Sequence, residues 1–599
     1  MASPISTELR DEDHPEFDNE SVWPRRLLHV PTMTSYKWQP GNKYGQYKEP
    51  PYHALSYTWG RWELKNDQQK PHVTALKIRG VGWRIPRIDP DHFSTTAFEH
   101  AIKESVKVPK PIWSQHRWER LKRRLASNKC NFLWLDVACI DQRGTPEAKK
   151  EIGRQARIFR SAQYAYVWLS QQKQTALLQL AHNLTRATEE IWKSDPSDAD
   201  SPTQRTVDWP QLSLESIDIL VKDPWLSSLW CLQEAFLRPD ALLLAREAQV
   251  VEEETSLILR LNYIFARVGS VYSYAEEIVA SKKALGPQLK PLTMLIEQTG
   301  LAALWTQNPM TLLTIARFRK ATRDVDRVYG IMQVFGDEFK VGEAKANGIT
   351  AGTHQSYSLA ELEDEFGALL LERCPVLSQM HVHIENPPLG TGWRICTASA
   401  IPPFASNPDN YNKTGSSLFG EPETVCKLST RNVAGRFWGH LAGRACAFTA
   451  LQRSWERQFS LGNDENWARR PPLSIALDRV AVLDEVPDFH SEIIGIDEAQ
   501  HRLADWLSKN ISGGRLMMFL MAQEVFGEWV MEGDDGPYSD RFVGMIILEQ
   551  VHQGMHYWHR LGICRWTSYC VKTSGPDEAD RDMLLGHGDE WQHIEGLFG

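Results

Sequence analysis

The sequence lacks the features of membrane and exported proteins. No apolar stretch in its 599 residues approaches the 18 or more residues that a membrane-spanning helix requires. The first 20 residues, MASPISTELRDEDHPEFDNE, contain neither the basic nor the apolar region of a secretory signal. We therefore expect a cytoplasmic protein without a membrane span, whose residues 1–24 form an acidic, disordered tail.

Positive charge is not in excess either. The chain has 67 Lys and Arg against 76 Asp and Glu, a formal net charge of -9. A protein that holds a phosphate backbone without base contacts depends on a strongly basic surface. The charge balance therefore predicts that nucleic acid is not a partner.

Cysteine is scarce, and nucleotide and hydrolase motifs are absent. The nine cysteines are scattered and never spaced as CxxC, which favours free buried thiols in a reducing compartment. His552, His556, His559 and Cys564 are ligand types, but they fall in an expected strand and turn, where their spacing scatters the side chains over both faces. The sequence contains neither GxxxxGK[ST], the phosphate-binding loop of nucleotide hydrolases, nor GxSxG, the nucleophile turn of α/β-hydrolases. We expect no metal and no resident cofactor.

The first half of the chain instead carries the pattern of an α/β domain. Residues 52–58 are aromatic and β-favouring, and the stretch stops at Gly60. Residues 132–140 are almost continuously apolar, as in a strand covered on both faces, and residues 164–170 repeat that pattern. Thr145-Pro146 opens an amphipathic stretch between them, so 147–162 is predicted to be a crossover helix. These elements predict neighbouring parallel strands.

The chain can be divided further along its length. Residues 194–202 form a polar surface insertion, and Asp223-Pro224 opens a helix that continues to residue 238. We expect a domain over 25–240, a helical extension over 241–350, and a mixed α+β region over 351–599 whose role the sequence does not reveal. Strand-like runs in that last region include residues 480–483 and 542–548.

Four segments in order resemble the fungal heterokaryon-incompatibility (HET) family. They are residues 52–60 (YHALSYTWG), 132–142 (FLWLDVACIDQ), 155–170 (ending AYVWLS) and 224–235 (PWLSSLWCLQEA). The resemblance implies a HET domain over 25–240 and a role in nonself recognition and regulated cell death.

The same domain also resembles Toll/interleukin-1 receptor (TIR) domains. Residues 228–234, SLWCLQE, match the plant-type TIR phrase, although the stretch between Ser170 and Asp223 is longer than the short link of a TIR domain. The resemblance implies a TIR-like, flavodoxin-like parallel sheet with flanking helices. It also implies that NAD is a substrate, cleaved at its nicotinamide–ribose bond, with Glu234 as the catalytic residue.

A protein with such a sheet binds its ligand beyond the carboxyl ends of the parallel strands, so we expect the substrate there. Nicotinamide leaves NAD as a neutral ring, so a single carboxylate that stabilises the ribose cation is sufficient. Arg61 offers a fork for a pyrophosphate, and the tryptophans offer stacking faces. The expected substrate-binding residues are Ser56, Thr58, Trp59, Gly60, Arg61, Asp136, Asp141, Trp225 and Trp230.

Each of these assignments has a structural alternative. Glu234 is also suited to a structural hydrogen bond, Trp230 to the core, and Arg61 to an exposed loop. Asp136 is suited to capping a loop or pairing with an arginine. For the domain as a whole, the alternative to an enzyme is a signalling domain that recruits a protein partner or associates with itself.

Overall fold

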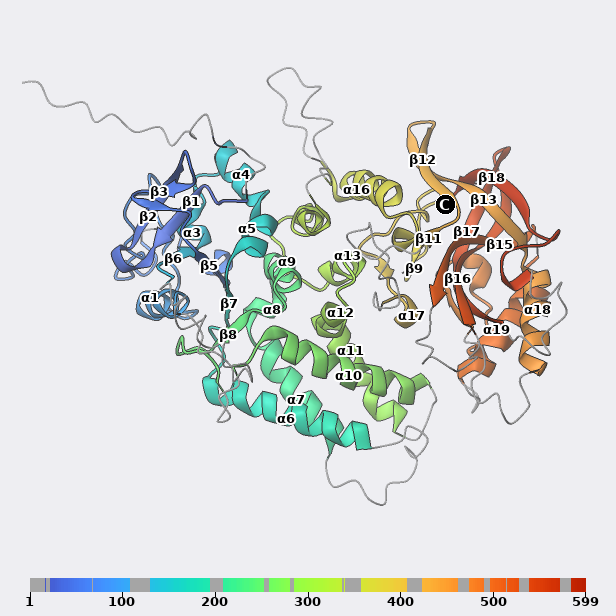
Figure 1. Ribbon diagram of the computed structural model, residues 1–599, viewed down its shortest axis with the longest axis horizontal. Helices are drawn as coiled ribbons and strands as arrows, with labels where there is room; N and C mark the ends of the chain where they lie inside the picture. The colour runs from blue at the N-terminus through green and yellow to red at the C-terminus, as the bar shows by residue number, and fades with distance from the viewer. Residues whose placement is uncertain are drawn as a thin grey trace, which may run out of the picture. The chain divides into compact units, whose positions relative to one another are not determined.

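The computed structural model describes residues 17, 22–66, 68–107, 130–193, 208–252, 258–280, 285–336, 339, 357–406, 423–461, 473–489, 496–512, 514–526, 538–570 and 583–599. Most of the predicted acidic tail and the whole predicted insertion at 194–202 lie outside these residues. The chain divides into two compact units, each with its own eight-stranded sheet (Figure 1). Unit 1 comprises residues 1–195, 203–272 and 318–321, and unit 2 comprises residues 196–202, 273–317 and 322–599.

Unit 1 is a mixed α/β unit. Its strand order is β4-β3-β2-β1-β6-β5-β7-β8, in which β6, β5, β7 and β8 are parallel and β1 to β4 extend the sheet with antiparallel pairs. The strands are β1 (Arg26–His29), β2 (Thr34–Gln39), β3 (Lys43–Tyr44), β4 (Tyr47–Lys48), β5 (Tyr52–Ser56), β6 (Phe132–Trp134), β7 (Ala165–Trp168) and β8 (Leu242–Leu244).

The three predicted parallel strands are confirmed as neighbours in one sheet. β5 lies between the other two: Ala54 is opposite Trp134 on β6 and opposite Ala165 on β7. Every residue of β5, β6 and β7 is buried, which explains why these strands are continuously apolar rather than alternating.

The predicted strand over 132–140 is wrong in its second half. After β6, residues Asp136–Cys139 form a single helical turn, α3. The Asp136 carboxylate accepts the amide of Val137 at 2.6 Å, and the amides of Ala138 and Cys139 bond to the Leu135 carbonyl. An acidic side chain at the start of the turn thus supplies backbone partners that replace a strand neighbour.

The predicted crossover helix is two helices, α4 (Pro146–Ile152) and α5 (Gln155–Ser161). Thr145 caps α4 as expected, because its side chain accepts the Ala148 amide. Near the break, the buried Glu151 carboxylate pairs with Arg154 at 3.1 Å and accepts the Arg25 amide at 2.9 Å. α4 ends at Gly153, whose amide bonds to the Lys149 carbonyl, and Arg154 stands at the start of α5 with its guanidinium on the buried Glu151.

The helix predicted over 224–238 is likewise broken. α8 (Pro224–Ser227) and α9 (Leu229–Leu237) are separated by Ser228, whose backbone is extended and forms a bridge with Lys320. The predicted cap is present, since the Asp223 carboxylate accepts the Trp225 amide. The break comes from a distant segment, so the local sequence contained no signal for it.

The described part of the predicted helical extension over 241–350 is mostly helical. α6 and α7 pack side by side in unit 1 (Figure 1). None of the described helices is long and apolar enough to cross a membrane. The remaining α-helices of the described residues, apart from those introduced with the site and with the sheet of unit 2, are α1 (Thr95–Glu104), α6 (Gln174–Lys193), α7 (Trp209–Val221), α10 (Leu261–Ala280), α11 (Gly286–Thr299), α12 (Leu301–Thr306), α13 (Met310–Ala316), α14 (Asp326–Tyr329) and α17 (Pro403–Ser406).

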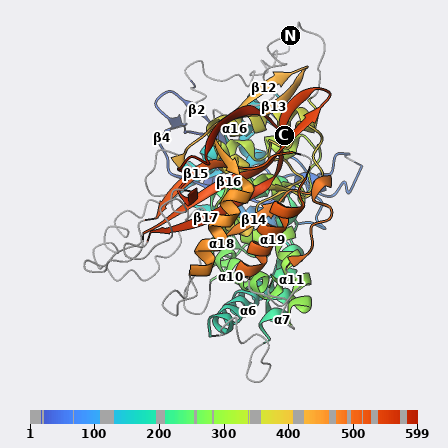
Figure 2. The same cartoon turned by 90° about the vertical axis from the view of Figure 1, so that its right-hand side faces the viewer.

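The larger sheet of unit 2 is almost entirely antiparallel (Figure 2). Five of its strands form a closed ring in the order β15-β16-β17-β18-β13, because β13 also pairs with β15. The strands of unit 2 are β9 (Val382–His383), β10 (Ser399–Ala400), β11 (Glu423–Thr424), β12 (Lys427–Val433), β13 (Arg436–Ala447), β14 (Ser474–Leu477), β15 (Leu516–Phe526), β16 (Tyr538–His552), β17 (Met555–Cys570) and β18 (Gln592–Phe598).

Both faces of this sheet are buried at β15. Met518 and Leu520 of β15 pack in a cluster with residues of α18 (Phe448–Leu461) and α19 (Ile496–Asn510). Met517 and Phe519 point into a second cluster, which includes Leu371 of α16 (Leu359–Arg373). The strand predicted at 542–548 is part of β16. That predicted at 480–483 is wrong, since Ala481–Leu483 form a 3-10 turn.

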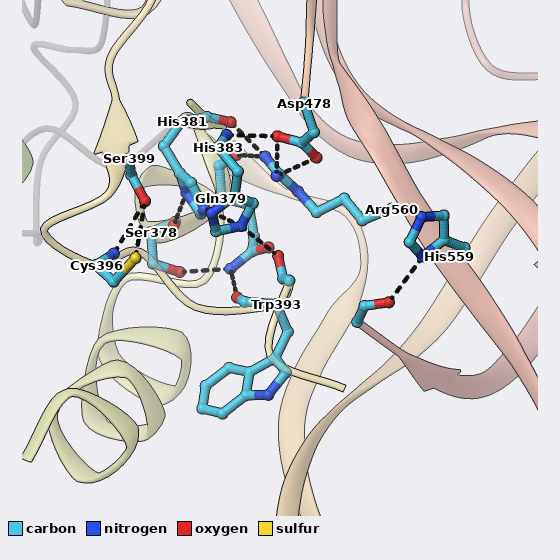
Figure 3. A network of polar contacts seen from close by, with 12 residues as sticks. Ser378, Gln379, His381, His383, Trp393, Cys396, Ser399, Asp478, His559 and Arg560 are labelled. Carbon is cyan, nitrogen blue, oxygen red and sulfur yellow. Dashed lines mark hydrogen bonds and ion pairs between the residues drawn. The ribbon is translucent and has the colours of Figure 1, made fainter. Parts of the chain in front are cut away.

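A buried polar network lies beside this sheet (Figure 3). The guanidinium of Arg560 on β17 donates to both carboxylate oxygens of Asp478, at 2.7 and 2.6 Å, and the two side chains are almost completely buried. Its second terminal nitrogen donates to the carbonyls of Gln379 and His381, and the His383 amide donates to Asp478 at 2.7 Å. Each charge is thus paired and hydrogen-bonded, as burial requires.

The eight cysteines whose side chains are described are free thiols, and six of them are buried. This agrees with the expectation of small buried hydrophobic residues without disulfides.

Candidate functional site

The polar side chains of unit 1 meet at the carboxyl end of β5. Ser56, the last residue of β5, donates its hydroxyl hydrogen to the Glu234 carboxyl on α9. The indole N–H of Trp225 on α8 donates to the Ser56 oxygen at 2.7 Å. An indole nitrogen can only donate, so Ser56 accepts from Trp225 and uses its own hydrogen for Glu234. The serine therefore acts as a relay that orients the carboxyl group.

Glu234 is half-buried, and its proton affinity is strongly altered. Burial, assisted by the nearby charge of Asp136, raises the pKa of Glu234 to about 8, against a smaller opposing effect of the Ser56 hydrogen bond. The side chain keeps some exposure to solvent. A carboxyl group that has a strongly shifted pKa and remains accessible to solvent is a candidate functional residue.

Asp136 forms a second acidic centre at the end of β6. Its carboxylate accepts the Tyr57 hydroxyl at 2.5 Å, the Trp59 indole N–H at 2.5 Å and the Val137 amide at 2.6 Å. Burial raises the pKa of Asp136 despite these donors. The partners are aromatic residues after β5 rather than an arginine, so Asp136 caps its own turn and fixes the loop that follows Ser56.

Asp223 links a further strand to α8. Its two carboxylate oxygens accept the amides of Trp225, at 2.9 Å, and of Gln171, which follows β7, at 3.0 Å. The group is buried, and burial raises its pKa to about 6, although both amides oppose this. Asp223 thereby holds Trp225 in place, and Trp225 in turn holds Ser56.

Arg61 reaches from the loop after β5 to α8. It lies in η2 (Gly60–Trp62), donates to the Pro224 carbonyl at 3.2 Å and to the Ser227 hydroxyl at 3.1 Å, and stacks over the Trp62 ring. Its side chain is exposed. These weak, solvent-accessible contacts leave its guanidinium able to exchange partners.

The other predicted residues have different surroundings. Trp225 is only 2 % exposed, so its ring faces lie within the protein and its indole N–H is the part that serves the site. Asp141 pairs with Arg143, two residues further along its own loop, at 2.6 Å. Trp230 is half-buried, Thr58 is buried, and Gly60 is exposed at the start of η2.

His92 and Gln171 belong to the same region and were missed from the sequence. The His92 ring stacks on Trp62 with centroids 3.7 Å apart, and its Nε2 donates to the Thr58 carbonyl at 2.6 Å. Burial lowers the pKa of His92 to about 4, so the ring is neutral. Gln171 donates to the His92 carbonyl at 2.5 Å. Only Gln171, directly after a predicted strand, had a positional signal.

Metal-binding side chains do not gather in the parts of the chain that the structure describes. No group of three or more His, Cys, Asp or Glu there is arranged to hold a metal ion.

The relay from Trp225 to Ser56 can be tested by a double-mutant cycle. Trp225→Phe removes the N–H together with part of a buried ring, so we expect it to lower the free energy of unfolding by about 2–4 kcal/mol, of which the lost hydrogen bond contributes about 1 kcal/mol. Ser56→Ala removes the acceptor. If the relay exists, urea denaturation of the double variant shows a smaller loss than the sum of the two single losses. Additive losses would argue against it.

Residues 52–234 match the family model described as Heterokaryon incompatibility protein (HET). The match confirms the resemblance that the four segments carry, and it indicates a heterokaryon-incompatibility type of function for this part of the chain. It starts at the first residue of β5 and ends at Glu234, so it includes both partners of the Ser56–Glu234 hydrogen bond. No curated protein and no solved structure matches the chain.

Proposed function

We propose that unit 1 hydrolyses NAD at the nicotinamide–ribose bond, with Glu234 as the catalytic residue, and that this activity acts in nonself recognition and regulated cell death. The observation that carries the proposal is the contact between Glu234 and Ser56, because it brings an accessible carboxyl group of altered pKa to the end of a central parallel strand.

The order of the parallel strands supports this location. Numbered along the chain, the strands β5, β6, β7 and β8 lie in the order 2-1-3-4, as do the first four strands of a flavodoxin-like sheet. In such sheets the ligand binds beyond the carboxyl ends of the strands, where the order reverses. That point is between β5 and β7, beside Ser56 and Gln171.

The chemistry requires little more than this carboxyl group. Water adds to the ribose carbon as its bond to nicotinamide breaks, the nicotinamide leaves with the bonding electrons as a neutral ring, and the water loses one proton. The ionised Glu234 stabilises the positive charge that develops on the ribose. The cationic nicotinamide of bound NAD itself favours that ionised form.

Arg61 is suited to the pyrophosphate. Its guanidinium offers paired donors, and the Pro224 carbonyl and Ser227 hydroxyl that it now contacts are weaker partners than a phosphate. Three half-buried tryptophans of this region could stack on the rings of NAD: Trp59, Trp62 and Trp230. The Trp62 ring already contacts Arg61 and His92.

The direct experiment is to incubate the purified full-length protein with NAD and to measure nicotinamide and ADP-ribose. Release of both in equal amounts supports hydrolysis. If neither product appears with a folded protein at any pH between 6 and 9, catalysis is excluded under these conditions. In that case recruitment of a protein partner, or self-association, becomes the better explanation of the domain.

The pKa of Glu234 predicts the pH dependence of this reaction. Because the ionised form is the active one, kcat/KM is expected to rise about tenfold per pH unit up to about pH 8 and then to level off. Stability should change in the opposite sense. The pKa is raised in the folded state, so the folded protein favours the protonated form. The stability of the wild type relative to Glu234→Gln should therefore fall as pH rises from about 4.5 to about 8. A kcat/KM that is flat between pH 6 and 8 would contradict this prediction.

A further inference from the structure

A four-residue segment from the middle of the chain joins unit 1 at the break between α8 and α9. Phe318–Ala321 belongs to unit 1, whereas Arg317 and Thr322 on either side belong to unit 2. The Lys320 amide donates to the Ser227 carbonyl at 2.7 Å, and the Leu229 amide donates to the Lys320 carbonyl at 3.3 Å. These two bonds form a parallel bridge between Ser228 and Lys320.

The bridge replaces bonds that a continuous helix would make. In an unbroken helix the Leu229 amide would donate to the Trp225 carbonyl, and the Ser227 carbonyl would accept the Cys231 amide. The local sequence favours that helix, since Asp223 caps it, Pro224 suits its first turn, and no glycine or proline follows before Pro239. The distant segment therefore overrides a local preference.

The break is necessary for the geometry around Ser56. Trp225 and Glu234 are nine residues apart, and at 100° per residue a continuous helix would turn them about 180° from each other and separate them by roughly 13 Å along its axis. On opposite faces, the two side chains would not meet at one hydroxyl group. In the structure both contact Ser56, because Ser228 is extended and lets α8 and α9 point in different directions.

The segment is also packed beside α9. Arg319 is buried, and its positive charge lowers the pKa of the Cys231 thiol against the dominant effect of burial, so the two side chains lie close together. Cys231 is itself buried, with its sulfur 3.9 Å from the Tyr57 carbonyl. Cys231 therefore reports on whether the segment is in place.

We propose that Phe318–Ala321 is a positioning element of the Glu234 site: its pairing with Ser228 holds the helix broken, so that Trp225 and Glu234 meet at Ser56. The consequence for turnover rests on the proposed NAD hydrolysis, whereas the pairing itself is tested independently of any activity. Residues far along the chain thus set the geometry of a site whose side chains all precede residue 235.

The first test compares Lys320→Pro with Lys320→Ala in the full-length protein. Both remove the exposed side chain, but only proline removes the amide that donates to Ser227. In Lys320→Pro we expect Cys231 to react with a thiol reagent at least tenfold faster, as mapped by mass spectrometry. We also expect NAD turnover at least tenfold below that of Lys320→Ala. The pH at half-maximal kcat/KM should rise, because Glu234 loses the hydrogen bond that lowers its pKa.

A gentler pair of variants applies if Lys320→Pro does not fold. Ser228→Ala and Ser228→Gly both remove the hydroxyl, but alanine favours a continuous helix over glycine by about fivefold. Ser228→Ala should therefore have the lower turnover and the faster labelling of Cys231. A simple loss of helix stability would predict the opposite order, because glycine is the weaker helix former.

Equal labelling and equal turnover within both pairs would overturn the positioning role. If the wild type cleaves no NAD, the proposed function fails, but the labelling of Cys231 still decides whether Phe318–Ala321 holds the break. If labelling differs between the variants while turnover and its pH profile do not, the segment holds the helix without positioning Glu234, and the proposal is wrong.

Discussion

Glu234→Gln is expected to lower NAD turnover at least ~100-fold, equivalent to about 2.7 kcal/mol of transition-state stabilisation, while the protein remains folded. Glutamine has nearly the same size as glutamate, and its amide oxygen accepts the Ser56 hydrogen in the same way. It has no negative charge with which to stabilise a cationic ribose. The loss should therefore appear in kcat, measured by nicotinamide release, whereas the thermal midpoint near neutral pH should be no lower than that of the wild type, because the variant does not ionise a buried carboxyl group.

The matched control is Glu215→Gln, which makes the same chemical change at an exposed position on α7. It should leave turnover and stability as they are in the wild type. Cell death on overexpression provides the second readout. A Glu234→Gln protein that accumulates normally and kills as well as the wild type would remove support for the enzyme and would favour death by partner recruitment.

Three parallel strands of the unit 1 sheet were predictable, whereas the fourth parallel strand, β8, and the antiparallel strands were not. Strands β5, β6 and β7 are buried on both faces and are therefore apolar throughout, a pattern that is visible in the sequence. Strands β3 and β4 have two residues each, and β8 has three. Segments so short have no periodicity, so only their hydrogen bonds to neighbours identify them.

The helix breaks show a different limit. The stretch around Ser228 has an ordinary helical sequence, whereas Gly153, a weak helix former, ends α4 directly before Arg154. In both places a partner distant in the chain contributes to the break. For Arg154 the partner is the buried Glu151–Arg25 contact, and for Ser228 it is Lys320. Before Arg154 the buried pair with Glu151 acts together with Gly153, whereas at Ser228 the backbone bonds to Lys320 override the local helix propensity.

The candidate site was predictable in its residue types but not in its contacts. Ser56 and Asp136 stand at the ends of predicted strands, and Glu234 was indicated by a resemblance. The direct bond from Ser56 to Glu234 was not foreseen. Asp223 was expected only to cap a helix, yet it also accepts the Gln171 amide and thereby links α8 to the end of β7. Such links depend on which loops meet, which the sequence does not specify.

The second large effect is expected in unit 2. Asp478→Asn keeps the shape of the side chain but leaves the buried guanidinium of Arg560 without a counter-charge, which should lower the free energy of unfolding by about 3–5 kcal/mol. The carbonyls of Gln379 and His381 still accept from Arg560, but they carry no net charge. Urea denaturation should show this loss.

The control for Asp478→Asn is Glu498→Gln, which breaks the exposed pair with Arg502 on α19. It should cost no more than about 0.5 kcal/mol, because water screens that pair. Combining Asp478→Leu with Arg560→Met removes both buried charges and should recover part of the stability that Asp478→Asn loses, since the unpaired charge is then gone. The recovery is limited because the Gln379 and His381 carbonyls and the His383 amide lose their partners. A loss below about 1 kcal/mol for Asp478→Asn would mean that water reaches Arg560 and that the pair is not sealed in the core. The double variant distinguishes a sealed Arg560 from a hydrated one. If Arg560 is sealed, the double variant should be more stable than Asp478→Asn; if water reaches Arg560, removing its charge should bring no increase in stability.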